Sequence, residues 1–121
     1  MDAQAQSPID PALTSAQFHI LLTLAEGERH GYGIMQEIER RTGGEVELGP
    51  GTLYRSIKQL LGRGLIAEVD GEGNNSSVAG NTRRSYTLTP MGKARTAEEA
   101  HRLRSLVQWA EDTLVLEGGQ G

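Results

Sequence analysis

The chain has 121 residues, no cysteine, a net charge of −4 and a hydrophobic content of only 36%. This length is enough for one domain with its own core, and the lack of cysteine excludes a disulfide framework and thiolate chemistry. No apolar run approaches the roughly 20 residues of a membrane span, and the N-terminus lacks the features of a signal peptide. We therefore expect a soluble cytoplasmic protein.

The positive charge is concentrated in two blocks, although the whole chain is acidic. Residues 51–64 carry three basic groups and no acidic one, and residues 83–95 carry four basic groups, again with no acidic one. The segments around these blocks are all net negative. If the fold brings the two blocks together, they form a local basic patch on an acidic body, and such a patch suits a nucleic-acid partner.

Two helices are expected in the first third of the chain. Residues 1–13 contain two prolines and little periodicity, so we interpret them as a flexible arm. Thr14 and Gln17 have the spacing of a capping box, and the apolar stripe that follows predicts a helix to about residue 26. After a turn at residues 27–31, a second helix is expected over about residues 32–42.

The third helix is expected over residues 50–64 and is the candidate DNA-recognition helix. Pro50 suits its first position, and Gly64 ends it after a basic last turn. One apolar stripe consists of Leu53, Ile57, Leu60 and Leu61. The opposite side carries Thr52, Arg55 and Gln59, with Ser56 and Lys58 on its flanks. Such a helix fits the major groove of DNA, where Arg can read guanine and Gln can read adenine.

A hairpin and a long helix complete the chain. Residues 65–69 and 84–88 have the composition of strands, and the polar, glycine-rich loop between them, about residues 70–82, is expected to be disordered at its tip. Thr89 as N-cap and Pro90 at the first position predict a final helix over residues 90–117, followed by a flexible tail at residues 118–121.

The final helix carries two apolar stripes. One stripe consists of Ala100, Leu103, Val107, Ala110 and Leu114, and the other of Leu106, Trp109 and Leu116. One of them can pack on the helix's own domain. The other is left without cover, and an uncovered stripe of this size indicates an interface.

The order of these elements predicts a mostly α-helical (α+β) fold, namely a winged helix-turn-helix with a two-stranded wing and a long C-terminal dimerisation helix. The winged-helix domain is expected over residues 14–89. In this layout the second helix supports the third, and the hairpin brings the two basic blocks onto one surface, which favours DNA binding.

Three segments also resemble a known family. They are residues 30–34 (HGYGI), residues 51–66 (beginning GTLYRSI and ending GLI), and residues 83–92 (beginning RRSYTLT and ending in Gly92). In this order and at this spacing they resemble the PadR family of bacterial transcriptional regulators, short form with a single C-terminal helix. The resemblance implies a homodimeric repressor of a partly palindromic operator that dimerises through its C-terminal helix. Some short members of the family bind flat hydrophobic compounds at the dimer interface.

The site residues follow from this interpretation. Arg55 and Gln59 are predicted to contact bases, and Thr52 and Ser56 to contact bases or phosphate. Lys58, Arg83 and Arg84 are predicted to contact phosphate, and Tyr54 either packs or donates to phosphate. The predicted dimer interface consists of Leu103, Leu106, Val107, Trp109, Ala110 and Leu114. Trp109 is also the candidate contact for a small aromatic effector.

Three other classes of function are weighed against DNA binding: a docking module, a ligand-binding scaffold that has lost DNA affinity, and an enzyme. A winged helix can serve as a protein–protein docking module, and the net charge of −4 leaves that alternative open. An enzyme is not expected, because no paired carboxylates and no nucleophile–base arrangement stand out. His19, His30 and His101 show no metal-ligand spacing, so no metal or other cofactor is expected.

Overall fold

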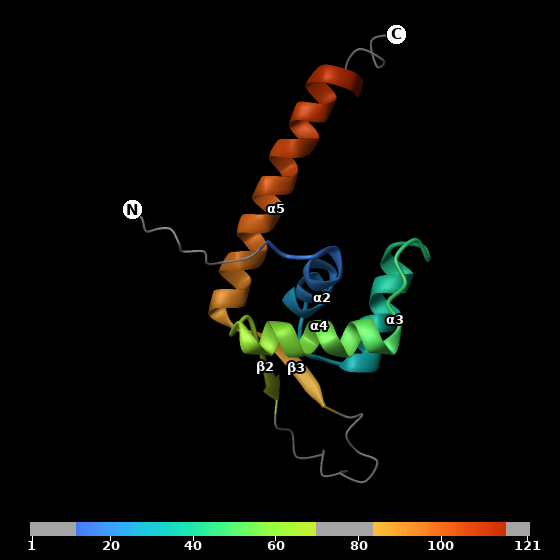
Figure 1. Cartoon of the computed structure of the whole chain (residues 1–121), viewed down its shortest axis with the longest axis vertical. Coiled ribbons are helices and arrows are strands. Elements are labelled where there is room, and N and C mark those ends of the chain that lie inside the picture. Colours follow the sequence, from blue (N-terminus) through green and yellow to red (C-terminus); the bar gives the residue numbers. More distant parts are fainter. Residues whose placement is uncertain (1–11, 70–83, 116–121) are drawn as a thin grey trace.

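The computed structural model describes residues 12–69 and 84–115 and is mostly helical, with a small antiparallel sheet and a long C-terminal helix. This confirms the predicted fold class. The elements in chain order are α2 (Ser15–Ala25), β1 (Arg29–His30), α3 (Gly31–Arg41), α4 (Pro50–Gly62), β2 (Ile66–Val69), β3 (Ser85–Leu88), α5 (Pro90–Ala110) and the π-helical turn η3 (Glu111–Val115) (Figure 1). Among the described helices, none is long and apolar enough to cross a membrane.

The predicted capping box starts α2. The backbone N–H of Gln17 donates to Oγ1 of Thr14 at 3.0 Å, and the backbone N–H of Thr14 donates to Oε1 of Gln17 at 2.9 Å. Two backbone donors that the first turn cannot use are thereby satisfied by side chains. The start of this helix is therefore determined by local chemistry.

The core lies between α2, α3 and α4. Its largest fully buried side chains are Ile20, Leu21, Ile34, Ile38, Leu53 and Leu60. The buried positions of each helix recur at intervals of three or four residues, as expected for helices that bury one face; examples are Ile20 and Leu24 in α2, Ile34 and Ile38 in α3, and Ile57 and Leu60 in α4. This packing holds α4 across the front of the domain, with its opposite face exposed (Figure 1).

The sheet has three strands in the order β1-β3-β2, all antiparallel. The hairpin of β2 and β3 was expected, whereas Arg29 and His30 were predicted as part of a turn. They pair instead with Tyr86 and Ser85 of β3. The predicted two-stranded wing is therefore present as β2 and β3, and β1 adds a third strand to its sheet that was not predicted, because a two-residue strand has no periodicity that a sequence could reveal and forms only when β3 lies beside it.

α5 begins in close contact with the domain and then leaves it (Figure 1). The Thr89 hydroxyl accepts from the backbone N–H of Gly92 at 2.9 Å and donates to the carbonyl of Gly64 at 2.7 Å. In α5 the buried residues are Gly92, Thr96 and Glu99. The expectation that one apolar stripe packs on the helix's own domain is thus wrong, because the helix diverges from the domain before most of that stripe is reached.

Several predictions fall on residues 1–11, 70–83 and 116–121, which lie outside the described residues. These are most of the N-terminal arm, the wing loop, the phosphate contact of Arg83, the position of Leu116 in the second stripe, and the C-terminal tail.

Candidate nucleic-acid interface

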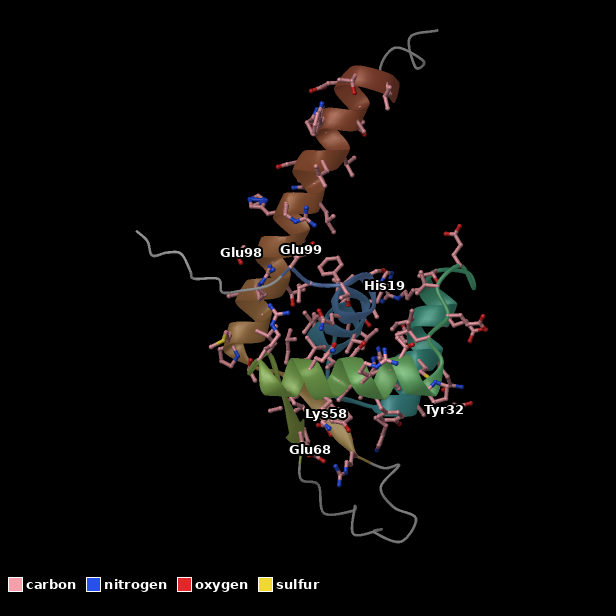
Figure 2. The ribbon with its side chains drawn as sticks, in the orientation of Figure 1. His19, Tyr32, Lys58, Glu68, Glu98 and Glu99 are labelled. Atoms are coloured by element: carbon pink, nitrogen blue, oxygen red, sulfur yellow. The ribbon has the colours of Figure 1, made fainter. Side chains whose placement is uncertain are left out.

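The outward face of α4 is polar and basic. Thr52, Arg55 and Lys58 are all exposed. Arg55 and Lys58 form no salt bridge with any residue in the described part of the chain, so both charges are available to a partner. Figure 2 shows Lys58 on the side of α4 from which the hairpin extends. A helix of this kind can enter a major groove with two cations at its surface.

Ser56 departs from its predicted position on the flank of this face. It is only 5% exposed and belongs to the buried side of α4, together with Leu53, Ile57 and Leu60. Leu61, predicted as core, is only partly buried. The helix is therefore rotated slightly about its axis relative to the predicted stripe, because the packing against α2 and α3 determines its orientation. Burial removes the support for a DNA contact by Ser56.

Gln59 is exposed on α4 but already has a partner within the protein. Its Oε1 accepts a hydrogen bond of 3.0 Å from Nε2 of Gln17, which lies on α2 and is 4% exposed. The sequence gives no sign of this contact, because the two residues are 42 positions apart. One end of the Gln59 amide is thus turned toward the domain.

Tyr54 combines packing with exposure. The residue is 42% exposed, while its hydroxyl lies against the start of α3, where a Cβ atom added to Gly31 would come within 2.6 Å of it. Gly31 therefore makes room for the tyrosine. Tyr32, the next residue, is 61% exposed. The start of α3 and the first half of α4 together present two tyrosine side chains at one edge.

The hairpin contributes Arg84, whose Nε lies 3.1 Å from Oε2 of Glu68 on the neighbouring strand, with both side chains largely exposed. Tyr86 is buried beside them. Burial raises the pKa of the Tyr86 hydroxyl, and the negative charge of Glu68 raises it further. Sequence reasoning missed Glu68, although strand alternation places residues 68, 84 and 86 on one face of the hairpin.

The site thus combines a basic helix face, a tyrosine edge and a hairpin arginine. Residues 20–98 match the transcriptional regulator PadR-like family. The chain belongs to this family. PadR-like proteins are DNA-binding transcriptional regulators and not enzymes.

Relatives of this PadR-like regulator include a transcriptional regulator of Mycobacterium tuberculosis, 32% identical over 78% of this chain and 80% of the relative. An uncharacterized transposon protein of Streptomyces fradiae is 34% identical over 75% of this chain, which spans only 24% of that protein. A PadR family regulator from Clostridium difficile has a similar fold, with a TM-score of 0.68, 24% identity, and coverage of 84% of this chain and 99% of the other.

Not every residue of the second basic block, residues 83–95, belongs to the candidate nucleic-acid interface. Arg95 lies 3.6 Å from the carboxylates of Glu98 and Glu99 on its own helix, and Glu99 also pairs with Arg102 at 2.6 Å. Figure 2 shows Glu99 on the side of α5 that faces α2. These pairs hold the pKa of Glu99 below its usual range. The prediction that both blocks form one surface is therefore wrong for Arg95.

One cavity lies away from this interface, between α2 and α3. It has a volume of about 210 Å³ and a mostly apolar lining that includes Leu22 and Ile38, with Glu26 and Arg41 beside them. Among the described residues, no group of three or more His, Asp or Glu side chains could hold a metal ion.

Proposed function

We propose that this PadR-like regulator is a homodimeric, sequence-specific repressor of a partly palindromic operator. The observation that carries the proposal is the outward face of α4, where exposed Arg55 and Lys58 lie without a salt bridge to any described residue. Arg55 and Thr52 read base edges, and Lys58, Tyr54 and Arg84 hold phosphates. Two copies related by a two-fold axis would place their α4 helices in successive major grooves, about 34 Å apart.

The far half of α5 and the turn η3 that follows it support the dimer. Leu106, Val107, Trp109 and Leu114 are between 42% and 69% exposed, and Leu103 and Ala110 are partly exposed beside them. A contiguous apolar surface of this kind is costly to leave in water. We propose that a second copy of α5 covers this stripe, because a two-fold axis brings the same surface of two copies together.

The proposal also includes a small aromatic effector that binds near Trp109. Trp109 is 65% exposed on α5, so two copies near the dimer axis could stack a small aromatic compound. Titration of aromatic compounds while Trp109 fluorescence is followed would test this part. A quench that saturates, together with release of DNA, is the expected result, and a flat response across a broad panel would remove the effector from the proposal.

A gel shift with the purified full chain on DNA from upstream of its own coding region tests the core of the proposal. Binding at physiological salt that survives random competitor DNA, together with a rise of transcription from that promoter when the protein is absent, is expected. Failure of any fragment to be retained in a genome-wide selection would contradict it. That outcome would favour the alternative, a winged-helix protein–protein docking module.

A further inference from the structure

The backbone determines which side chain donates in the hydrogen bond between Gln17 and Gln59. The backbone N–H of Thr14 can only donate a hydrogen bond, so the side-chain amide of Gln17 must turn its oxygen toward it, at 2.9 Å. The nitrogen of the same amide then faces α4 and donates to Oε1 of Gln59 at 3.0 Å. The capping box of α2 therefore dictates which end of the Gln59 amide is turned inward.

Burial makes this orientation difficult to reverse. Gln17 is 4% exposed, and a buried polar atom that loses its partner incurs the full cost of its desolvation. If the Gln59 amide rotated by half a turn, its NH₂ group would face the NH₂ group of Gln17, and both would lack an acceptor. Gln59 thus keeps its oxygen turned toward α2. Its NH₂ group is the end of the amide that remains available to a partner in solvent.

We propose that Gln17 is a positioning residue for sequence specificity, because it makes Gln59 a hydrogen-bond donor toward DNA. This inference rests on the proposed function, in which α4 enters the major groove. Reading adenine with both ends of the amide requires the glutamine oxygen to accept from the adenine amino group. With that oxygen turned to Gln17, Gln59 selects bases whose major-groove edge presents acceptors and no amino group, namely guanine and thymine. This replaces the adenine preference expected from the sequence.

A single substitution should invert this preference. In Gln17→Glu both side-chain oxygens are acceptors, so one keeps the bond from the backbone N–H of Thr14 and the other requires the NH₂ group of Gln59. The Gln59 oxygen is then left outward and accepts from cytosine or adenine. Selection of bound sites from a random DNA pool, carried out with the full chain, should change the preferred base at one position of each half-site by about fivefold or more.

Two further variants separate this role from a structural one. Gln17→Met keeps the volume but offers no donor, so Gln59 should rotate freely and the base preference at that position should relax while the Arg55 position stays selective. Gln36→Glu adds the same charge at an exposed position of α3 and should leave the selected sequence unchanged. Circular dichroism confirms the fold of each variant, and Gln17→Met carries the test if Gln17→Glu does not fold.

A second readout needs no DNA. In the free protein, the side-chain NH₂ resonance of Gln59 should shift and exchange more slowly with solvent in Gln17→Glu, since that group then donates to a carboxylate. A wild-type protein that selects no sequence would overturn the proposed function and this inference with it. A selective wild type, with folded Gln17 variants that select the same base at every position, would overturn this inference alone.

Discussion

At the scale of single residues, α4 separates side chains that can contact DNA from those that the fold already uses. Arg55 and Lys58 are exposed, whereas Ser56 is buried and Gln59 is held by Gln17. Side chains that look equivalent on a helical projection therefore differ in what they can bind. The specificity of the regulator should depend on fewer residues than the polar face suggests.

Arg55→Ala should remove base discrimination. A bidentate arginine contact with guanine distinguishes that base by about 1–3 kcal/mol. The expected result is a loss of affinity for the operator by that amount, with little change on random DNA, measured by fluorescence anisotropy at fixed salt. Lys58→Ala is the control and should weaken both DNAs by the same factor. An equal loss on both DNAs for Arg55→Ala would show that this residue contacts only phosphate.

Arg84→Ala should weaken binding to all sequences alike. Its ion pair with Glu68 joins two largely exposed side chains and contributes little, so Arg84 can exchange the carboxylate for a phosphate at low cost. Loss of one phosphate contact should reduce the slope of log K against log salt by about 1. A salt titration of the wild type and the variant measures this, and an unchanged slope would exclude a phosphate contact by Arg84.

Among the described glycines, Gly92 has the least room for a side chain. A Cβ atom there would lie 1.9 Å from the carbonyl oxygen of Leu65, which is backbone and cannot move aside as a side-chain end would. Gly92→Ala should therefore lower the free energy of unfolding by about 3 kcal/mol, at the upper end of the range for overpacking, as measured by urea denaturation. Gly33→Ala is the matched control, because nothing lies within 4 Å of its added Cβ.

At the scale of elements, a network of ion pairs joins α2 to α3. Glu37 pairs with Arg40 at 2.6 Å and with Arg41 at 2.9 Å, and Arg41 also contacts Glu26 of the preceding segment. Hydrogen bonds from the two arginines lower the pKa of Glu37 from 4.5 to about 2. The network lies at the surface, so each pair is screened by water and salt.

The contribution of Glu37 to stability should depend on pH with a definite sign. Because its pKa is lower in the folded state, the contribution is fully present above pH 4.5 and is lost as the pH falls toward about 2. Urea denaturation of the wild type and Glu37→Gln at pH 7, 4 and 2 should give a difference that shrinks with acid. The exposed Glu39→Gln serves as control, and a difference that does not depend on pH would contradict the role of the ion pairs.

At the scale of the whole molecule, the winged-helix domain and the far half of α5 have different proposed roles, namely DNA contact and dimerisation. Thr89 and Gly92 hold the start of α5 against Gly64 and Leu65, which link α4 to β2, so the direction in which α5 leaves the domain is set at this link. In a dimer built through α5, this attachment would determine the spacing of the two α4 helices. Dimer geometry and operator spacing would then be coupled through the first turn of α5.

Leu106→Asp should separate dimerisation from folding. A charge in the apolar stripe should shift the sedimentation coefficient toward the monomer and weaken operator binding strongly, since a monomer contacts only one half-site. The circular dichroism of the domain should be unchanged, because Leu106 is 42% exposed in the single chain. Gln108→Glu, on the opposite side of α5 by helical projection, is the control. A variant that remains dimeric would place the interface elsewhere.

The sequence by itself determined the features that depend on neighbouring residues. The capping box of Thr14 and Gln17, the start of α5 at Thr89 and Pro90, and the apolar stripe of α4 are local patterns that act through nearby backbone groups and side-chain periodicity. These patterns, taken in order with the expected hairpin, were enough to predict the winged-helix fold.

Only the tertiary structure decided the contacts between residues far apart in the chain. The pairing of Arg29 with Tyr86, the burial of Ser56 and the bond between Gln17 and Gln59 depend on how the helices and the sheet pack together. A rotation of α4 by a fraction of a turn exchanges Leu61 for Ser56 in the core while the hydrophobic periodicity stays the same. Local sequence determines the helices and the hairpin, whereas the packing of several elements at once determines the third strand and which side chains remain for DNA.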